Sequence, residues 1–539
     1  MKVANRYEAV SDGESRARGD ALVAWLRDYA ERRVNSRLID ERRCIPPHVA
    51  LDFGNRGLFG VQVEERFGGL ALRNREIARI LEQAAAIDLG LGTWLLTSLF
   101  PGVRPIAAFA TARLKAELLP LLAQGRMLAG YAQTEPGAGT HFAAMSARAQ
   151  ANARGWSLTG EKVWIGNATW AGLLTVMAHD VEDGGRRRGL TALAVRTEQP
   201  GVALGRELLS MGMRGMVQSE VAFHDVAVGP DALVGERGKG LEVGVDSMSW
   251  SRFAIAATCV GAMKRCAQLM LRFASRRTIA TGKLVEHPVL LASLGEAVAR
   301  IRGAEGLLYR VAEVLDRGDG VAVELFAACK FVGSEFLWQT ADGLVQSLGS
   351  RGYDEANLAP QLLRDARVTR IFEGTSEALA AFLGAAALVP SSEIYTFLRR
   401  ELDADALADE LAASVGRLRA RDGAALGLAA GELPRAWQCA LAGSAASWAL
   451  VAAVAAQDAA RAPAPELARV ADWSRRQFAD SLERATRGAP AESVLFDATQ
   501  AEKAVSALAE SVGDPEPRLP GEKRGLDPLL RRTPPANGS

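Results

Sequence analysis

The sequence predicts an α+β protein in four parts: an N-terminal helical domain, a middle β barrel or sandwich, a C-terminal helix bundle and an extra C-terminal helical domain. Long segments with apolar residues at helical spacing occupy both ends of the chain. Between them lie short runs of alternating and β-branched residues separated by turn signals. A chain of 539 residues is also too long for one core, so several domains are expected.

The first helical domain is expected over residues 1–127. The segment "ESRARGDALVAWLRDYAERR" places apolar residues on one helical face and charged residues on the other. A second segment, "IARILEQAAAIDLGLGTWLLTSLF", is apolar on most faces, which is typical of a core helix. Between them, "GLFGVQVEERFGGLAL" contains repeated glycines and is predicted to be a loop.

The β region is expected over residues 128–239. Its predicted strands are "WSLTGEKVWIGNA", "LLTVMAHD", "GLTALAVRT" and "SEVAFHDVAV". Helical spacing returns over 240–388, which predicts a helix bundle, and continues through a helical extension over 389–512. The tail, 513–539, is rich in proline, glycine and charge and is predicted to be disordered.

Composition and charge argue against several classes of function. The net charge of +1 gives no reason to expect nucleic acid or an anionic membrane as a partner. The five cysteines form no CxxC pair and the five histidines no HxxxH pair, so no metal site is predicted and reduced thiols in a cytoplasm are expected. The N-terminus lacks the apolar run of a signal peptide.

One apolar segment requires a membrane test. Residues 440–456, "ALAGSAASWALVAAVAA", carry no charge. They are fewer than the roughly 20 residues that a spanning helix needs, and they are rich in weakly apolar alanine, glycine and serine. We therefore predict a buried helix and no transmembrane segment.

Two segments around the β region have the composition of a ligand site. "YAQTEPGAGTH" (131–141) combines hydroxyl groups with a Pro-Gly turn and small residues, which let a backbone approach a ligand closely. An ordinary hairpin loop is the alternative. In "GEKVWIGNATWA" (160–171), Trp164 could stack on a flat ring or could equally be a core residue of a strand.

Two further segments lie in the helical bundle. "RRTIATGKLVEHP" (276–288) brings two arginines to a helix end, where they could hold a phosphate or simply be solvated. "RIFEGTSEAL" (370–379) places Glu373 between an aromatic residue and a Gly-Thr turn. That carboxylate could be aimed into a cavity, or it could be the solvated end of a helix.

Together, in this order and on a helix–strand–helix background, these motifs resemble the FAD-dependent acyl-CoA dehydrogenase family. The resemblance covers about residues 15–388, and the segments at 131–141 and 362–377 are its most specific parts. It implies two helical domains around a β barrel, with FAD between the barrel and the C-terminal bundle. It also implies a homo-oligomer, as a homodimer or a homotetramer, because the cofactor site is shared across subunits.

The resemblance assigns expected roles to individual residues. Three of the cofactor residues, Arg277, Gln346 and Gly349, are expected to reach the adenine and pyrophosphate half of an FAD in a neighbouring subunit. The substrate is expected to contact Thr140, Arg252 and Gly374. The complete expected set for FAD is Tyr131, Gln133, Thr134, Thr140, Trp164, Ile165, Gly166, Arg277, Gln346, Gly349, Thr375 and Glu377.

Glu373 matches the catalytic base of the family. It is expected to remove the α-proton of an acyl thioester while the β-hydride leaves to flavin N5, which gives the 2-enoyl thioester. In relatives the backbone N–H of this glutamate and a ribityl hydroxyl polarise the thioester carbonyl. Desolvation should raise the pKa of the carboxyl. Some relatives carry the base at the position of Ser251 instead, so Glu373 is the one base in a family position here.

The chain departs from the family pattern at several positions. His141 replaces an acid after the turn, Ala280 an aromatic residue beside the pyrophosphate arginine, and Ser350 a glycine. Gly166 stands where many dehydrogenases have a hydroxyl that hydrogen-bonds near N5, an interaction worth about 1 kcal/mol. The space beside Gly166 could admit O2, as in an acyl-CoA oxidase, or hold a water. The acceptor is therefore either O2 or an electron-transferring flavoprotein.

Two alternatives concern the substrate class. The acyl group could be bound to a carrier protein instead of CoA. A DNA-alkylation-response subfamily of similar length binds DNA through a basic C-terminal region, and the segment 248–288 resembles it. Residues 391–539 hold 18 lysines and arginines against 21 acids, a net charge of −3, which argues against a DNA role because DNA affinity depends on basic side chains.

Overall fold

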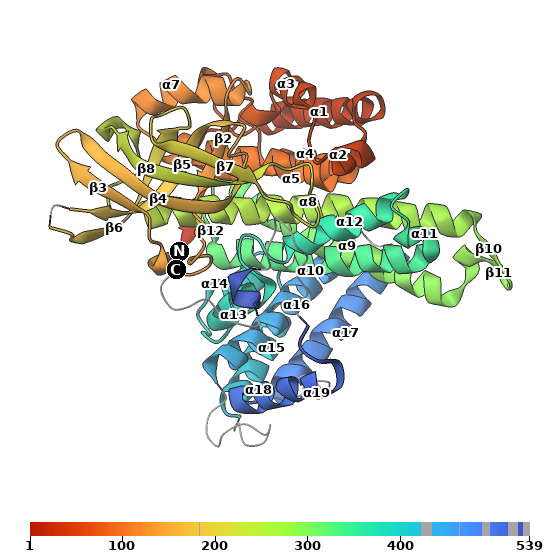
Figure 1. The fold of residues 1–539 in the computed structure, drawn as a ribbon. Coiled ribbons are helices and arrows are strands. Elements are labelled where there is room, and N and C mark those ends of the chain that lie inside the picture. Colours follow the sequence, from red (N-terminus) through yellow and green to blue (C-terminus); the bar gives the residue numbers. More distant parts are fainter. Residues whose placement is uncertain (183, 422–433, 463, 488–495, 516–526, 532–539) are drawn as a thin grey trace.

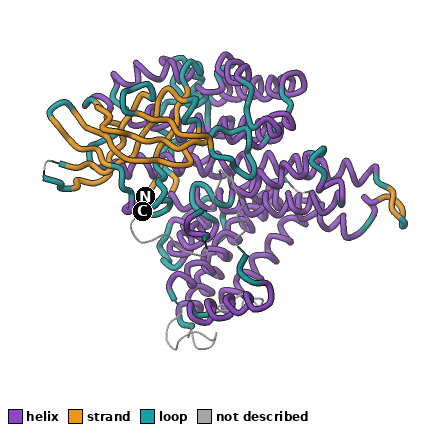
Figure 2. The backbone as a smooth tube through the Cα atoms, in the orientation of Figure 1, coloured by secondary structure: helices purple, strands orange, loops and turns teal. Residues whose placement is uncertain are grey.

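The computed structural model describes residues 1–539 except 183, 422–433, 463, 488–495, 516–526 and 532–539. Helices at the N-terminus lie beside a β domain, and both rest on the long helices of a bundle (Figure 1). A further group of helices extends from the opposite side of the bundle. Figure 2 shows that nearly all strand residues are gathered in the one β domain. The predicted α+β class is confirmed.

The N-terminal region is helical as predicted. Its helices are α1 (Asp12–Arg33), α2 (Ser36–Arg42), α3 (Pro47–Asn55), α4 (Asn74–Ile87), α5 (Leu89–Thr97), α6 (Arg104–Phe109) and α7 (Ala112–Ala123). The predicted single core helix over 77–100 is wrong. It is α4 and α5 followed by a π-helical segment, η3 (Ser98–Val103), because Asp88 has extended backbone and caps α5 by accepting from the Leu91 N–H at 2.6 Å.

The β domain is one mixed sheet of eight strands. Its order is β7-β8-β4-β3-β5-β6-β9, and β2 pairs with β5 in parallel. The strands are β2 (Leu128–Ala132), β3 (Arg148–Asn152), β4 (Gly155–Gly166), β5 (Ala171–Val181), β6 (Arg187–Arg196), β7 (Val202–Glu207), β8 (Gln218–Val228) and β9 (Leu233–Val234). The four predicted strands correspond to β4, β5, β6 and β8, while β2, β3, β7 and β9 were not predicted.

The bundle is built around one long helix. Its helices are α8 (Gly240–Arg276), α9 (Pro288–Asp316), α10 (Val323–Leu348), α11 (Ser350–Tyr353), α12 (Leu358–Thr369) and α13 (Ser376–Ala387). The N-terminal strand β1 (Lys2–Val3) pairs with β12 (Val321–Ala322) and ties the chain start to the bundle. The segment 276–288 contains a short hairpin of β10 (Thr278–Ile279) and β11 (Gly282–Lys283), which was not predicted.

The extension contains α14 (Glu393–Arg400), α15 (Asp405–Arg419), α16 (Arg435–Arg461), α17 (Pro465–Arg487), α18 (Ala498–Ala507) and α19 (Ala509–Val512). Helix α16 lies directly on α13: a side-chain carbon at Gly384 would stand 1.7 Å from the Cys439 carbonyl oxygen. Most of the tail for which disorder was predicted, 516–526 and 532–539, lies outside the described residues.

The apolar segment 440–456 is part of α16, and the prediction of a buried helix is confirmed. The argument from length is wrong, because the helix runs for 27 residues, beyond the uncharged core. Within the described part of the chain, α16 is the one helix that could cross a membrane by length and composition, and 78% of its apolar window is buried. Its apolar surface therefore packs against α13, α9 and α17 in one continuous core.

Candidate active site

The loop after β2 lies directly against the end of β4, so the two segments predicted to hold a flat ring are neighbours. The Val163 N–H donates to the Thr134 carbonyl at 2.9 Å, and Lys162 Nζ donates to the Gln133 carbonyl at 2.9 Å. A side-chain carbon at Gly130 would stand 2.7 Å from the Gly166 carbonyl oxygen, so these backbones approach closely. Residues 131–134 and 163–166 therefore form one surface. Tyr131 and Gly166, two of the residues expected to bind the cofactor, belong to it.

Trp164 projects from this surface into the open. It is 53% exposed and has a φ of 63° at an irregularity in the pairing of β4 with β8 between Lys162 and Ile165. A bulky residue in the left-handed region is uncommon and is found where tertiary structure requires it. The alternative that Trp164 is a core residue is therefore wrong. Ile165, by contrast, has its side chain in the core of the β domain, at 2% exposure.

The N-terminal half of α8 borders the same surface. The Tyr131 hydroxyl donates to Gln133 Oε1 at 2.9 Å. A side-chain carbon at Gly244 would stand 3.3 Å from that hydroxyl, so the glycine permits α8 to approach. Burial raises the pKa of Tyr131 far above its ordinary value, and the charges of Glu373 and Asp246 raise it further. Glu373 is thus electrostatically coupled to the β2 segment.

A buried ion pair anchors the 131–141 loop, and the sequence analysis missed it. Lys162 Nζ contacts Glu135 Oε1 at 2.8 Å, and both side chains are almost completely buried. Glu135 also accepts from the backbone N–H groups of Ser146 and Ala147, at 2.5 Å and 3.1 Å. Lys162 and the two N–H groups hold the pKa of Glu135 below its usual value, although burial opposes them.

Replacing Glu135 with alanine is expected to destabilise the protein by about 3–5 kcal/mol, because the change leaves the Lys162 ammonium buried without a counter-ion. The measurement is the free energy of unfolding from urea titrations. The double variant Glu135→Ala/Lys162→Met should recover part of the loss. The matched control is Glu161→Ala, an exposed neighbour on β4. Equal stability of Glu135→Ala and Glu161→Ala would show that the pair does not anchor the loop.

Glu373 lies in a turn between α12 and α13 whose backbone is held from both sides. Glu373 and Gly374 have φ values of 54° and 99°. Arg252 Nε donates to the Glu373 carbonyl at 3.1 Å, and Lys330 Nζ donates to the Gly374 carbonyl at 2.7 Å. Gly374 adopts its positive φ without strain, whereas the left-handed conformation is costly for Glu373, and these two cationic donors help to hold it.

The rest of the turn is fixed by α10 and by the start of α13. Glu335 on α10 accepts from Arg370 Nε at 2.6 Å and also from the Ser376 hydroxyl. The Thr375 hydroxyl oxygen caps α13 by accepting from the Ala378 N–H at 3.3 Å. Glu377 is exposed in the first turn of α13, where backbone N–H groups lower the pKa of its carboxyl. Thr375 and Glu377 therefore have structural roles in this turn.

The electrostatics of Glu373 differ from those of a solvated helix end. Burial raises the pKa of its carboxyl above the ordinary value, and the charges of Arg252 and Lys330 partly oppose this shift. A carboxyl with a raised pKa binds a proton more tightly than an exposed one, which suits it to remove a weakly acidic proton. The alternative of a solvated helix end is therefore not supported.

Lys330 is the functional candidate that the sequence analysis missed. Its side chain is completely buried, and no carboxylate of the described residues lies within ion-pair distance. Burial lowers the pKa of its ammonium to about 8, and Arg252 lowers it further. A lysine inside the apolar segment "LFAACKFVGSEFLW" was the available signal, because a buried lysine requires a specific partner.

The remaining predicted cofactor residues gather at a different place. Arg277 caps the C-terminal end of α8, and Gln346 and Gly349 end α10 beside α11. Helix geometry separates Arg277 from Arg252 by about 37 Å along α8. Because a ligand pocket of several hundred cubic ångströms is roughly 10 Å across, the two groups do not line one compact pocket of this chain. Thr140 lies exposed in the 131–141 loop.

Among the described residues, no group of three or more His, Cys, Asp or Glu side chains could hold a metal ion. The residues that could hold an organic cofactor are instead the exposed Trp164 ring and the backbone of 131–134 and 163–166. The structure thus provides an exposed ring and a backbone surface at residues 131–134 and 163–166, and a half-buried carboxyl at Glu373 whose charge acts on Tyr131.

Comparisons with known proteins agree with this arrangement. Three family models match: the N-terminal domain of acyl-CoA dehydrogenases at residues 18–126, the middle domain at 130–226 and the C-terminal domain at 238–388. The very long-chain specific acyl-CoA dehydrogenase of Rattus norvegicus is 32% identical over 333 residues, which are 61% of this chain and 51% of that protein. The chain thus spans about half the length of the curated relatives it matches.

Two solved structures are informative about the fold. An acyl-CoA dehydrogenase complexed with FAD from Bacillus anthracis has a TM-score of 0.73 at 21% identity, over 95% of this chain and 94% of that one. That likeness extends through the C-terminal extension. A prolyl acyl carrier protein oxidase has a TM-score of 0.65 at 25% identity, over 70% of this chain and 99% of that one.

Proposed function

The chain belongs to the acyl-CoA dehydrogenase family, and from this premise we propose that it is an FAD-dependent oxidoreductase that converts an acyl-CoA to the 2-enoyl-CoA. The single observation that carries the proposal is Glu373, held in a left-handed turn by Arg252 and Lys330 with the pKa of its carboxyl raised. A structural glutamate at a helix end would have no need of such a turn.

The residues present fit FAD. The exposed Trp164 ring offers a stacking surface, and the backbones of 131–134 and 163–166 offer hydrogen bonds to the edge of a flat ring. The cofactor, when bound there, supplies the acceptor for a hydride. Its adenine half would be held by Arg277, Gln346 and Gly349 of a neighbouring subunit, which agrees with the distance of Arg277 from Arg252 along α8.

In this proposal Glu373 performs the proton transfer. Its carboxylate oxygen accepts the α-proton of the acyl thioester, and Arg252 and Lys330 keep the turn in the geometry that aims it. Within the described part of the chain, the Glu373 N–H donates no hydrogen bond to protein, although the N–H groups before it do. It is available to the thioester carbonyl oxygen, where enolate-like charge develops as the proton leaves.

Oligomerisation is part of the proposal. The surface around Arg277 carries exposed apolar side chains, among them Tyr353 at 87%, Val289 at 69% and Leu271 at 50%. Such a group marks an interaction surface. It supports a homodimer or a homotetramer in which one subunit completes the cofactor site of the next. All five cysteines are unpaired, which supports a reducing compartment such as the cytoplasm.

The neighbourhood of Gly166 favours a dehydrogenase over an oxidase. A side-chain carbon at Gly166 would stand 2.8 Å from Thr97 Cγ2, so the space beside this glycine is filled by a methyl group. The Thr97 hydroxyl is already engaged, because it donates to the Thr93 carbonyl at 2.8 Å. We therefore favour an electron-transferring flavoprotein as acceptor rather than O2.

Reduced wild-type enzyme is accordingly expected to recolour slowly in air, and Thr97→Ser to recolour severalfold faster. Serine removes only the methyl group and keeps the hydroxyl bond, so it opens the space beside Gly166. The rate is read from the return of flavin absorbance after mixing with oxygenated buffer. Thr93→Ser, a buried hydroxyl one turn earlier, is the matched control. Equal rates for all three proteins would show that the Thr97 methyl group does not limit the reaction of the reduced flavin with O2.

The experiment that tests the function is an anaerobic titration of the purified flavoprotein with saturated acyl-CoAs of different length and branching. Bleaching by one chain class supports the proposal and identifies the substrate class. Bleaching only by acyl groups attached to a carrier protein would assign a carrier thioester, the substrate suggested by the oxidase neighbour. No bleaching by either thioester, with FAD bound, would overturn the proposal and favour the alternative of a DNA-binding flavoprotein.

A further inference from the structure

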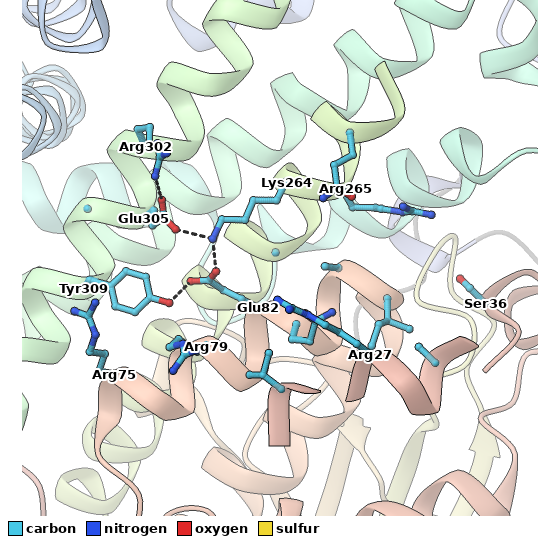
Figure 3. A pocket seen from close by; sticks show the side chains of 18 of the residues that line it. Arg27, Ser36, Arg75, Arg79, Glu82, Lys264, Arg265, Arg302, Glu305 and Tyr309 are labelled. Carbon is cyan, nitrogen blue, oxygen red and sulfur yellow. Dashed lines mark hydrogen bonds and ion pairs between the residues drawn. The ribbon is translucent and has the colours of Figure 1, made fainter. Parts of the chain in front are cut away.

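A large cavity lies away from the candidate active site, between the N-terminal domain, the bundle and the extension. It has a volume of about 1350 Å³ and is lined by α1, α4, α8 and α9, with residues of α16 and α17 at one end (Figure 3). Nine arginine and lysine side chains line it against six carboxylates. The proposed dehydrogenation uses none of these residues.

Most of the cations in this lining are already neutralised. Lys264 Nζ lies 2.5 Å from Glu82 Oε2 and 2.6 Å from Glu305 Oε1. Arg302 lies 3.1 Å from the other oxygen of Glu305, and Tyr309 donates to Glu82 at 2.6 Å. Figure 3 shows this network along one side of the cavity. It joins α4, α8 and α9 and needs no ligand.

Three arginines of the lining, Arg27, Arg265 and the exposed Arg461, have no such partner among the described residues. Arg265 on α8 is half-buried, and no carboxylate of the described residues lies within ion-pair distance of it. Burial lowers the pKa of its guanidinium, and repulsion by Arg272 lowers it further. Arg27 on α1, across the cavity, donates through Nε to Gln83 Oε1 at 2.7 Å, which leaves its terminal amino groups available.

An uncompensated cation that is partly removed from water is costly, and proteins normally pair it. Guanidinium groups match phosphate and carboxylate oxygens through two parallel hydrogen bonds. The cavity is larger than a single anion requires, and the unpaired guanidinium groups of Arg27 and Arg265 come from different helices. An extended ligand with more than one anionic group could pair with both of these guanidinium groups.

We propose that this cavity binds a ligand with two or more linked phosphate groups, such as a nucleoside diphosphate, through Arg265 and Arg27. The carboxylates Glu31 and Glu466, which line the cavity without a cation, are both exposed to solvent. The whole lining, with nine cations against six carboxylates, carries a net charge of +3, which favours an anionic ligand. This site is independent of the proposed dehydrogenation, because none of its residues belongs to the turn of Glu373.

The test is calorimetric titration of the FAD-saturated protein with inorganic pyrophosphate and with ADP at low ionic strength. Saturation with FAD keeps ADP out of the cofactor site. We expect both probes to bind, and binding to weaken as salt is added. The variant Arg27→Gln/Arg265→Gln should lose roughly tenfold or more in affinity, because charged hydrogen bonds to phosphate are removed. Arg302→Gln, an ion-paired arginine of the same lining, is the matched control.

The probes distinguish the source of the phosphates. Tighter binding of ADP than of pyrophosphate would assign a nucleotide, and equal binding an inorganic polyphosphate. Three results would overturn the proposal: no binding at millimolar probe, equal affinity in the double variant, or a fall in oligomer mass in the double variant without any binding, which would show that a second copy covers the cavity. Arg27 is exposed, so Arg27→Gln alone serves if Arg265→Gln does not fold.

Discussion

Replacing Glu373 with glutamine is expected to lower the rate of flavin reduction by an acyl-CoA about 100- to 10,000-fold, while FAD and acyl-CoA still bind. Glutamine keeps the size and the backbone N–H of the residue but accepts no proton. The turn itself should survive, because Arg252 and Lys330 bind backbone carbonyls and not the carboxylate. Stopped-flow bleaching of the flavin under anaerobic conditions measures the rate.

The matched control for Glu373→Gln is Glu377→Gln. Glu377 follows four residues later, is exposed on α13 and has the pKa of its carboxyl lowered rather than raised. Its replacement should leave the bleaching rate within a few-fold of wild type. Rapid bleaching in Glu373→Gln would contradict the assignment of the base and would require another proton acceptor in the site.

Replacing Lys330 with methionine is expected to slow flavin reduction and to move the acidic limb of the pH–rate profile to higher pH. The Lys330 charge lowers the pKa of Glu373, so its removal lets that pKa rise further. Methionine also removes the donor to the Gly374 carbonyl, so the turn loses one of the two side-chain hydrogen bonds to its backbone. The rate of anaerobic bleaching across pH 5 to 10 gives the profile.

The same variant makes a prediction about stability. Burial lowers the pKa of Lys330 from 10.5 to about 8, so between these values the unfolded chain binds the proton and the folded chain does not. Stability attributable to Lys330 therefore rises as pH increases from 8 to 10.5, by about 3 kcal/mol. The free energy of unfolding of the wild type, relative to Lys330→Met, should rise over this range.

The outcome that would contradict this account is a Lys330→Met enzyme that is slower but has an unchanged pH profile. Such a result would assign Lys330 a purely structural role. Lys330→Arg, which keeps the charge and the donor, provides the control and should restore part of the rate. A pH-independent stability difference would show that Lys330 keeps an ordinary pKa in the folded protein.

The local pattern of apolar and polar residues predicted the strands in which buried and exposed residues alternate along the chain. Strands such as β4 and β8 have one face in the core of the β domain, so their buried residues recur with a period close to two. Local pattern did not predict the end of α4 at Asp88, because the residues on both sides are equally apolar. It also underestimated α16, whose buried surface continues past the uncharged segment.

The residues of the candidate site likewise divide into those that the local sequence indicates and those that it does not. The turn at Glu373 was indicated by the glycine and threonine that follow it in sequence, whereas the role of Glu373 as the base rested on the family resemblance and stays a prediction. The apolar segment around Lys330 indicated burial, but the partners of Lys330 and Glu135 were not predictable, because they lie 44 and 27 residues away. The exposure of Trp164 depends on the pairing irregularity of β4 with β8, which no single strand encodes.

The measurement that tests the central claim most directly is the mass of the thioester recovered after one anaerobic turnover with an acyl-CoA carrying deuterium at the α or the β carbon. The account predicts a product that has lost one hydrogen from each carbon, in an amount equal to the flavin bleached, and little product from Glu373→Gln in the time of one wild-type turnover. Recovery of the acyl-CoA unchanged, with FAD bound and still oxidised for every chain class, would contradict it.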